Sequence, residues 1–205
     1  MTILALETST RHGSVCLIRD GQVAFDKPFV AERAHSVGLF VALHSAMRGS
    51  CAIDRIAVGV GPGSYAGVRI AIAAATGLQF ACGADLVGIP SAAAFLVDRD
   101  DYYVIGDARR ATFYFTHVRG GICMEGPLLL DEAKLRERLT ASNGAQVVSS
   151  DFLPAFAEVR HALPLARRVA ELAASDAAIT QRGTIEPIYL REPHITEPRA
   201  KPAQL

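Results

Sequence analysis

The alternation of apolar and polar positions is most informative between residues 56 and 81. A short apolar run at 56–60 leads through a Gly-Pro-Gly turn at 61–63 into a segment, 67–81, that is apolar on nearly every side. A short β-branched run predicts a buried strand, and the long segment after the turn predicts a helix. Arg69 is the only charge in that helix. A helix lying on a sheet normally shows a polar stripe to water, so we expect it to be either buried or covered by another chain.

A second segment, residues 34–48, predicts another helix of this kind. Its apolar residues form two neighbouring stripes: Leu39, Leu43 and Ala46, and beside them Val37, Phe40, Val41 and Met47. Too much of its circumference is apolar for a lone helix that faces solvent. Two such helices in one half of the chain favour a surface that binds a partner.

The remaining pattern predicts two halves that each mix strands with helices. In the first half we expect strands at 2–6, 14–18, 23–30 and 86–89, and a helix that starts near Pro90-Ser91. In the second half we expect strands at 102–105, 112–118, 122–130, 146–149 and 185–190, and helices from 131 to about 141 and from 163 to 174. The charged run at 98–101 marks the boundary. The pattern predicts an α/β protein with one domain at 1–100 and a second, trimmed domain at 101–205, whose tail from about 192 is poorly ordered.

Charge and cysteine content narrow the class of protein. The 21 basic and 21 acidic residues cancel, and no basic run suggests nucleic acid or an anionic membrane as a direct partner. The four cysteines form no CxxC pair. The N-terminal residues lack the features of a signal peptide, and the longest uncharged stretch, 70–84, is too short to span a membrane. We expect a cytoplasmic protein that does not contact a membrane.

One candidate phosphate site combines the polar loop after the first strand with the Gly-Pro-Gly turn. Its residues are Glu7, Thr8, Ser9, Gly61, Gly63 and Ser64. Backbone N–H groups at a helix N-terminus bind phosphate, and Ser64 could cap that helix. The spacing matches neither the Walker A nor the dinucleotide pattern, and no Lys follows. A solvated turn after the strand and a loop that serves only geometry explain the same residues.

The sequence offers little for metal or nucleophilic catalysis. None of the six histidines lies four residues from another, so no helix presents a two-histidine metal face. No Ser stands in a GxSxG turn. We therefore expect no metal site and no catalytic residues.

Several motifs together resemble the TsaB (YeaZ) family. They are ILALETST at 3–10, Ala34-His35-Ser36, GVGPGSYAGVRIAIAAATGL at 59–78, DARR at 107–110 and PIYLR at 187–191. The resemblance is in good register to about residue 110 and looser to 191. It departs from the family at Glu7, where Asp is usual, at Tyr65-Ala66, where Phe-Thr is usual, and near Thr112, where an acid usually follows DARR.

The resemblance implies a two-lobed fold of the actin-like, Hsp70 and sugar-kinase class (ASKHA), with a reduced second lobe. It implies a non-catalytic scaffold or activator that binds TsaD, the subunit that transfers the threonylcarbamoyl group to adenosine 37 of tRNA. The ATPase TsaE would join the complex, tRNA would be involved indirectly, and the chain alone would form a homodimer. TsaD has a His-x-x-x-His metal motif where this chain has IPSAAAF at 89–95. The resemblance thus implies no cofactor of its own, with ATP or ADP bound only in complex with partners.

The apolar helices and the resemblance both predict the same partner surface. Its expected residues are His35, Ser36, Leu39, Phe40, Leu43, Met47, Val68, Arg69, Ile72, Ala75 and Gln79. An interface of roughly 1,600 Å² is the scale to expect. A glutamate at Ala71 or Ala75, whichever faces outward, should abolish pairing. The alternative is a small ATP-binding, kinase-like enzyme or ATPase of the same fold; a peptidase lacks support from any nucleophile or metal cluster.

Overall fold

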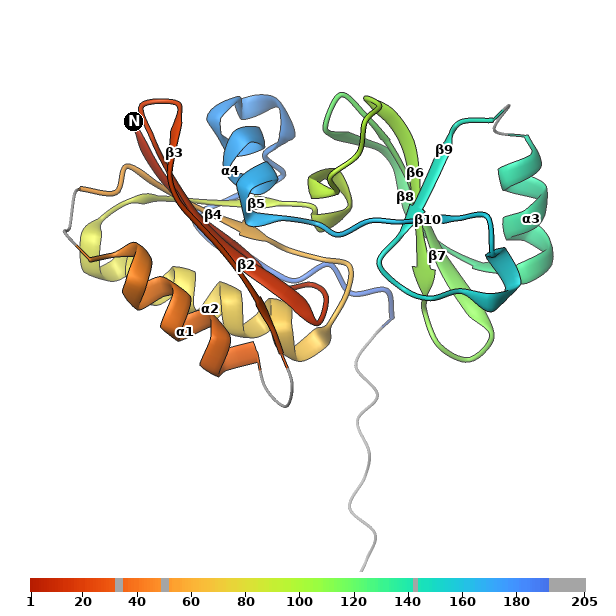
Figure 1. The fold of residues 1–205 in the computed structure, drawn as a ribbon, viewed down its shortest axis with the longest axis horizontal. Helices are drawn as coiled ribbons and strands as arrows, with labels where there is room; N and C mark the ends of the chain where they lie inside the picture. Colours follow the sequence, from red (N-terminus) through yellow and green to blue (C-terminus); the bar gives the residue numbers. More distant parts are fainter. Residues whose placement is uncertain (32–34, 49–51, 142–143, 192–205) are drawn as a thin grey trace, which may run out of the picture.

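The computed structural model describes residues 1–31, 35–48, 52–141 and 144–191. Two β-sheets lie side by side, and helices cover their faces (Figure 1). The strands of the first sheet are β1 Thr2–Glu7, β2 His12–Arg19, β3 Gln22–Val30, β4 Arg55–Gly59, β5 Asp85–Ile89 and β11 Gln181–Arg182. Their order is β11-β5-β4-β1-β2-β3. The central strands β1, β4 and β5 are parallel and buried, as their continuous apolar runs predict.

Helices cover both faces of the first sheet. Helices α1 His35–Ala46 and α2 Tyr65–Cys82 pack on one face, and α4 Ala166–Ala174 packs on the other, against β1, β2 and β4 (Figure 1). Two separate apolar cores result, one on each side of the sheet. The three predicted helices at 34–48, 67–81 and 163–174 are confirmed, with ends shifted by a few residues.

The second sheet follows the predicted pattern of strands. Its members are β6 Asp101–Asp107, β7 Thr112–Arg119, β8 Ile122–Asp131, β9 Gln146–Ser149 and β10 Arg160–His161, in the order β10-β9-β6-β7-β8. Helix α3 Glu132–Thr140 packs on β7 and β8. The Asp131 side chain caps α3 by accepting a hydrogen bond from the backbone N–H of Lys134 at 2.8 Å. A third apolar core lies between α3 and this sheet.

Two predicted elements are wrong. The helix expected near residue 90 is a single 3₁₀ turn, η1 Ser91–Ala94. Ser91 does not cap it, because its Oγ atom accepts a hydrogen bond from the backbone N–H of Gly61 instead. Residues 185–190 form no strand either; the last strand within the described residues is β11, a few residues earlier.

Two late elements of the described chain return to the first sheet. Both α4 and β11 fall within 101–205, the range predicted for the second domain, but α4 packs on β1 and β2 while β11 pairs with β5. The sequence gives no sign of this return, because β11 has only two residues and owes its place to its neighbours.

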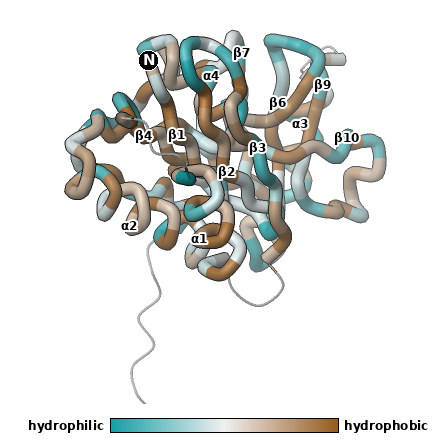
Figure 2. Tube along the Cα trace, turned by 60° about the vertical axis from the view of Figure 1, so that its left-hand side comes forward, coloured by the Kyte–Doolittle hydropathy of each residue, from teal (hydrophilic) through white to brown (hydrophobic). Residues whose placement is uncertain are grey.

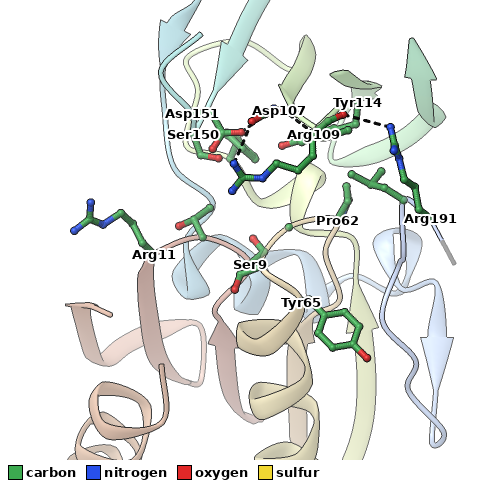
Figure 3. A pocket seen from close by; sticks show the side chains of 16 residues that line it. Ser9, Arg11, Pro62, Tyr65, Asp107, Arg109, Tyr114, Ser150, Asp151 and Arg191 are labelled. Carbon is green, nitrogen blue, oxygen red and sulfur yellow. Dashed lines mark hydrogen bonds and ion pairs between the residues drawn. The ribbon is translucent and has the colours of Figure 1, made fainter. Parts of the chain in front are cut away.

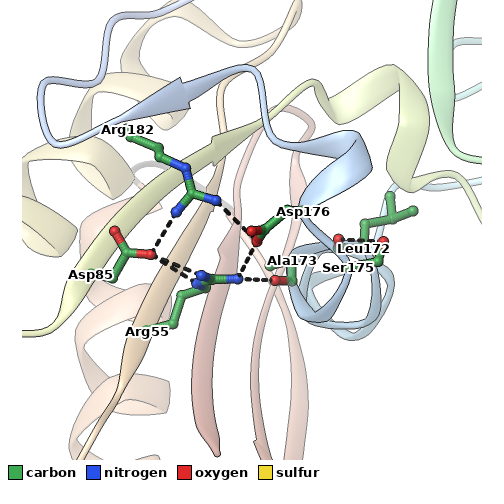
Figure 4. A network of polar contacts seen from close by, with 7 residues as sticks. All are labelled: Arg55, Asp85, Leu172, Ala173, Ser175, Asp176 and Arg182. Carbon is green, nitrogen blue, oxygen red and sulfur yellow. Dashed lines mark hydrogen bonds and ion pairs between the residues drawn. The ribbon is translucent and has the colours of Figure 1, made fainter.

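A network of ion pairs fastens the returning segment (Figure 4). Arg55 of β4, largely buried, pairs with Asp85 at 3.0 Å and with Asp176 at 3.1 Å, and donates to the carbonyl of Ala173. Arg182 of β11 pairs with the same two carboxylates at 2.8 and 2.9 Å. The hydrogen bond from Arg182 is the largest cause that holds the pKa of Asp176 below its usual value.

The two arginines of this network should differ in their effect on stability. We expect Arg55→Ala to lower the free energy of unfolding by about 1.5–3 kcal/mol, because its largely buried guanidinium makes hydrogen bonds to two carboxylates and to the carbonyl of Ala173. Arg182→Ala, at a half-exposed position, should cost about 1 kcal/mol or less. Urea unfolding of both variants checks this. Equal losses would contradict the central role of Arg55.

Candidate functional site

Helices α1 and α2 lie next to each other, and each buries one side in the core and exposes the other side to solvent. The inward residues Leu39, Ala42, Leu43 and Ala46 of α1, and Val68, Ala71 and Ala75 of α2, are buried. The outward side chains are also large and apolar: Val37 is 71%, Phe40 54%, Val41 53% and Phe80 85% exposed. Figure 2 shows hydrophobic residues along both helices. We call this outward surface the α1–α2 face.

A groove of about 620 Å³ runs along this face between the two helices. Its lining consists of Ser36, Phe40, Leu43, His44 and Met47 from α1 and Ile70, Ala73, Ala74, Gly77 and Leu78 from α2. Apart from Ser36 and His44 the lining is apolar. A Cβ atom placed on Gly77 would meet nothing within 4 Å, so the groove is open there.

Only part of the predicted partner surface lies on this groove. Ser36, Phe40, Leu43 and Met47 line it. Arg69 is exposed, Ile72 and Gln79 are half-buried, and of His35 only the backbone is described. Leu39, Val68 and Ala75 are buried and present almost no surface to a partner, which corrects the prediction.

The side of each helix that faces the sheet could not be read from the sequence. Both sides are apolar, so hydrophobic periodicity does not distinguish them. Ala71 and Ala75 are both fully buried, and a glutamate at either position would disturb the core rather than test an interface. The prediction missed the exposed side chains Val37, Val41 and Phe80. It also missed six residues of the groove lining: His44, Ile70, Ala73, Ala74, Gly77 and Leu78. The clustering of apolar side chains around Val37 and Val41 was the available signal.

Arg69 makes local contacts at the start of α2. Its guanidinium lies over the Tyr65 ring, 5.0 Å from the centroid, and donates to the Tyr65 hydroxyl. Tyr65 in turn packs on Tyr189, with ring centroids 5.4 Å apart. Arg69 therefore supports this aromatic pair, and Ser64 caps the same helix end by accepting from the backbone N–H of Gly67.

Most of the candidate phosphate loop is buried. Glu7, Thr8, Ser9 and Gly61 have almost no exposed surface. The Thr8 hydroxyl donates to the carbonyl of Gly67 at 2.8 Å, tying the loop after β1 to the start of α2. The expectation of a solvated turn is therefore wrong for Glu7. Only Ser9, Gly63 and Ser64 of this set line a cleft.

Glu7 is a fully buried carboxyl group. Its Oε1 accepts a hydrogen bond from the backbone N–H of Ser9 at 2.6 Å, whereas Oε2 has no hydrogen-bond partner among the described residues. Burial is the main cause that raises the pKa of Glu7, and hydrogen bonds from Ser9 and Ser91 oppose it. Compared with a free glutamate, the folded protein thus holds the proton at this position more tightly.

Stability should therefore depend on the protonation of Glu7. Because its pKa is higher in the folded than in the unfolded chain, the folded state binds the proton more tightly. Stability should decline as pH rises from the ordinary pKa of a glutamate towards the raised value. Urea unfolding between pH 5 and pH 8 checks this, and Glu7→Gln should flatten that part of the profile. A wild-type profile that rises with pH over the same range would contradict it.

A cleft of about 640 Å³ lies between the two sheets (Figure 3). The loop after β1 and the start of α2 form one wall; the β6–β7 corner, the end of β9 and Arg191 form the other. At the corner, Asp107 accepts from the backbone N–H of Arg109 at 2.7 Å. Arg191 donates to the Thr112 hydroxyl and to the Arg109 carbonyl. Among the residues described, no three His, Cys, Asp or Glu side chains gather as a metal site would require.

The family model for TsaD, described as tRNA N6-adenosine threonylcarbamoyltransferase, matches residues 26–126. The tRNA threonylcarbamoyladenosine biosynthesis protein TsaB of Haemophilus influenzae is 35% identical over 130 residues, which is 58% of this chain and 54% of that protein. TsaB of Bacillus subtilis is 35% identical over 85 residues, 39% of this chain and 37% of that protein. These matches support the resemblance to the TsaB/YeaZ family.

Solved structures agree with the fold expected for a TsaB/YeaZ protein. YeaZ from Pseudomonas aeruginosa superimposes with a TM-score of 0.72 and 24% identity, over 92% of this chain and 99% of that one. A second Pseudomonas aeruginosa structure, described as similar to the peptidase YEAZ, gives 0.76 with 24% identity over 93% and 99%. The predicted α/β fold is confirmed, and it is the fold of these two structures. The chain spans about half the length of the first two curated relatives, 56% of an uncharacterised Mycobacterium leprae protein and 54% of the Haemophilus TsaB.

Proposed function

We propose that this TsaB-family chain is a partner-binding subunit in the biosynthesis of threonylcarbamoyladenosine in tRNA. Its partner would be a TsaD-like transferase that docks on the α1–α2 face. The pathway named for the two TsaB relatives, tRNA threonylcarbamoyladenosine biosynthesis, supports this role. The apolar character of the outward helix surface supports the mode of action.

The observation that carries this proposal is the set of large apolar side chains that α1 and α2 expose. Val37, Phe40, Val41 and Phe80 are each more than half exposed. Burying one such side chain contributes about 1.5–3 kcal/mol, so leaving several in water is costly unless a partner covers them. Because the groove lining carries no Asp, Glu, Lys or Arg, the matching surface should itself be apolar and helical.

The chain would act without catalysing the transfer itself. Residues 89–95, where the resemblance to TsaD would place metal ligands, form the end of β5 and the η1 turn, and Ser91–Ala94 are buried. None of the side chains in that turn is a His, Cys, Asp or Glu. In this proposal ATP or ADP binds only when the chain is in complex with its partners, and a TsaE-like ATPase joins that complex. The chain acts in the cytoplasm and contacts tRNA only indirectly, through its partners. In isolation it forms a homodimer.

The proposal is tested by mixing the purified chain with the TsaD-like protein of the same organism and measuring association by light scattering. We expect a stable complex. Cells depleted of the chain should lose threonylcarbamoyladenosine from their tRNA, as measured by mass spectrometry of digested nucleosides. Absence of a complex together with unchanged tRNA would refute the proposal, and ATP hydrolysis by the isolated chain would favour the enzyme instead.

A further inference from the structure

The segment 185–191 is anchored on the first sheet and ends at the second one. Ile185 is buried in the apolar core between the first sheet and helices α1 and α2. The backbone N–H of Ile188 donates to the carbonyl of Val60, directly after β4, at 2.8 Å. The last described residues then lie between the two sheets (Figure 1). The segment therefore spans from one wall of the cleft to the other.

Arg191 joins this segment to the β6–β7 corner, residues 107–112. Its guanidinium donates to the Thr112 hydroxyl and, at 3.3 Å, to the Arg109 carbonyl. The Thr112 hydroxyl in turn donates to the same carbonyl at 2.7 Å. The Arg191 side chain points towards this corner in Figure 3. Three hydrogen bonds thus converge on two residues of the corner, and two of them come from Arg191.

The backbone of this corner is strained. Three consecutive residues, Arg109, Arg110 and Ala111, have left-handed φ angles of 65°, 55° and 55°. None of them is a glycine, so each would be more stable in an ordinary conformation. Strain of this kind persists only where the surrounding contacts hold it. The hydrogen bonds from Arg191 are contacts of that type, and they come from outside the corner.

Elsewhere the two sheets are joined in a way that does not depend on Arg191. The core that contains α4 includes residues of both sheets, for example Ile3 of β1 and Val104 of β6. Tearing this core open would expose apolar surface. The contacts of Arg191 are polar and half-exposed, and water can replace them. The corner is therefore the part of the cleft wall that can move while the core stays closed.

We propose that residues 185–191 form a clasp, in which Arg191 holds the β6–β7 corner in its left-handed conformation and so fixes the width of the cleft. When the contacts of Arg191 break, the corner relaxes into an ordinary turn and its wall of the cleft shifts. The cleft then has two discrete states, clasped and released, that differ by a few hydrogen bonds. The clasp uses none of the residues of the α1–α2 face, so it does not depend on the proposed function.

NMR measurements on Arg191→Gln test the proposal. In the wild-type protein, residues 109–111 should each give the strong nuclear Overhauser effect between their own amide and α protons that a positive φ angle produces. We expect this signature to be lost in the variant. Hydrogen exchange at the Ala108 and Thr112 amides, which donate within the corner at 2.9 and 3.2 Å, should accelerate by about tenfold or more, since hydrogen bonds from a charged group are lost.

Arg182→Gln is the matched control. It removes the same charge from the same returning part of the chain, but its partners are Asp85 and Asp176, away from the corner. We expect the NMR signature and the exchange rates of the corner to stay unchanged. Thr112→Val removes one acceptor of Arg191 from the opposite side and should change both readouts in the same direction as Arg191→Gln.

Three results would overturn the proposal. The first is a wild-type protein without the positive-φ signature at residues 109–111, which requires no variant to fold. The second is an Arg191→Gln protein that keeps both the signature and the slow exchange of the corner. The third is an equal change in Arg182→Gln, because the corner would then respond to a general loosening of the returning segment and not to release of the clasp.

Discussion

Ala73→Glu should abolish binding of a TsaD-like partner while leaving the fold intact. Ala73 lies on the exposed side of α2 and lines the groove between the helices. In the free chain the new carboxylate would remain in water, and glutamate is a good helix former. In the complex it would be buried without a counter-ion in an apolar contact, so we expect affinity to fall by more than about 100-fold. Calorimetric or light-scattering measurement of the complex checks this.

Ala157→Glu is the matched control for this experiment. It introduces the same side chain at an exposed position that follows the 3₁₀ turn η2 Pro154–Phe156, beside the second sheet. We expect unchanged affinity and an unchanged circular dichroism spectrum. If Ala73→Glu bound the partner as tightly as the wild-type chain, the α1–α2 face would not be the docking surface. If both variants lost binding equally, the effect would reflect charge and not position.

Gly59→Ala should destabilise the fold by about 3 kcal/mol. A Cβ atom at this position would lie 1.9 Å from Oε2 of Glu7 and 2.9 Å from Oγ of Ser91. The backbone at Gly59 needs no special conformation, so the whole cost arises from this contact. The buried carboxyl would have to move and give up its hydrogen bond to the backbone N–H of Ser9. Thermal and urea unfolding measure the loss.

Gly77→Ala is the control, because a Cβ atom there meets nothing within 4 Å. In the middle of α2 it should raise stability by about 0.5–1 kcal/mol. A Gly59→Ala variant as stable as the wild type would show that the Glu7 carboxyl rearranges freely. The close packing of β1, β4 and η1 around that carboxyl would then lose its importance.

The buried position of Glu7 could not have been foreseen from its neighbours in the sequence. A carboxylate at the end of a strand is ordinarily solvated. Here the parallel pairing of β1 with β4, and the contact of η1 with the Gly61 N–H, close over it from segments far along the chain. The walls of the cleft also come from segments that are far apart in the sequence. The sequence therefore could not predict that Arg109 and Arg191 lie in one cleft with the start of α2.

The sequence by itself determined the two apolar helices, the Gly-Pro-Gly turn, the paired strands and the resemblance to a family. These features depend on local periodicity, on turn residues and on short motifs, and each of these signals lies within a short stretch of the sequence. Tertiary structure alone decided which side of α1 and α2 faces outward, because both sides are apolar and only packing on the sheet selects one. It also decided that β11 joins the first sheet, since a strand of two residues, held by pairing with β5 and by the ion pairs of Arg182, carries no pattern of its own.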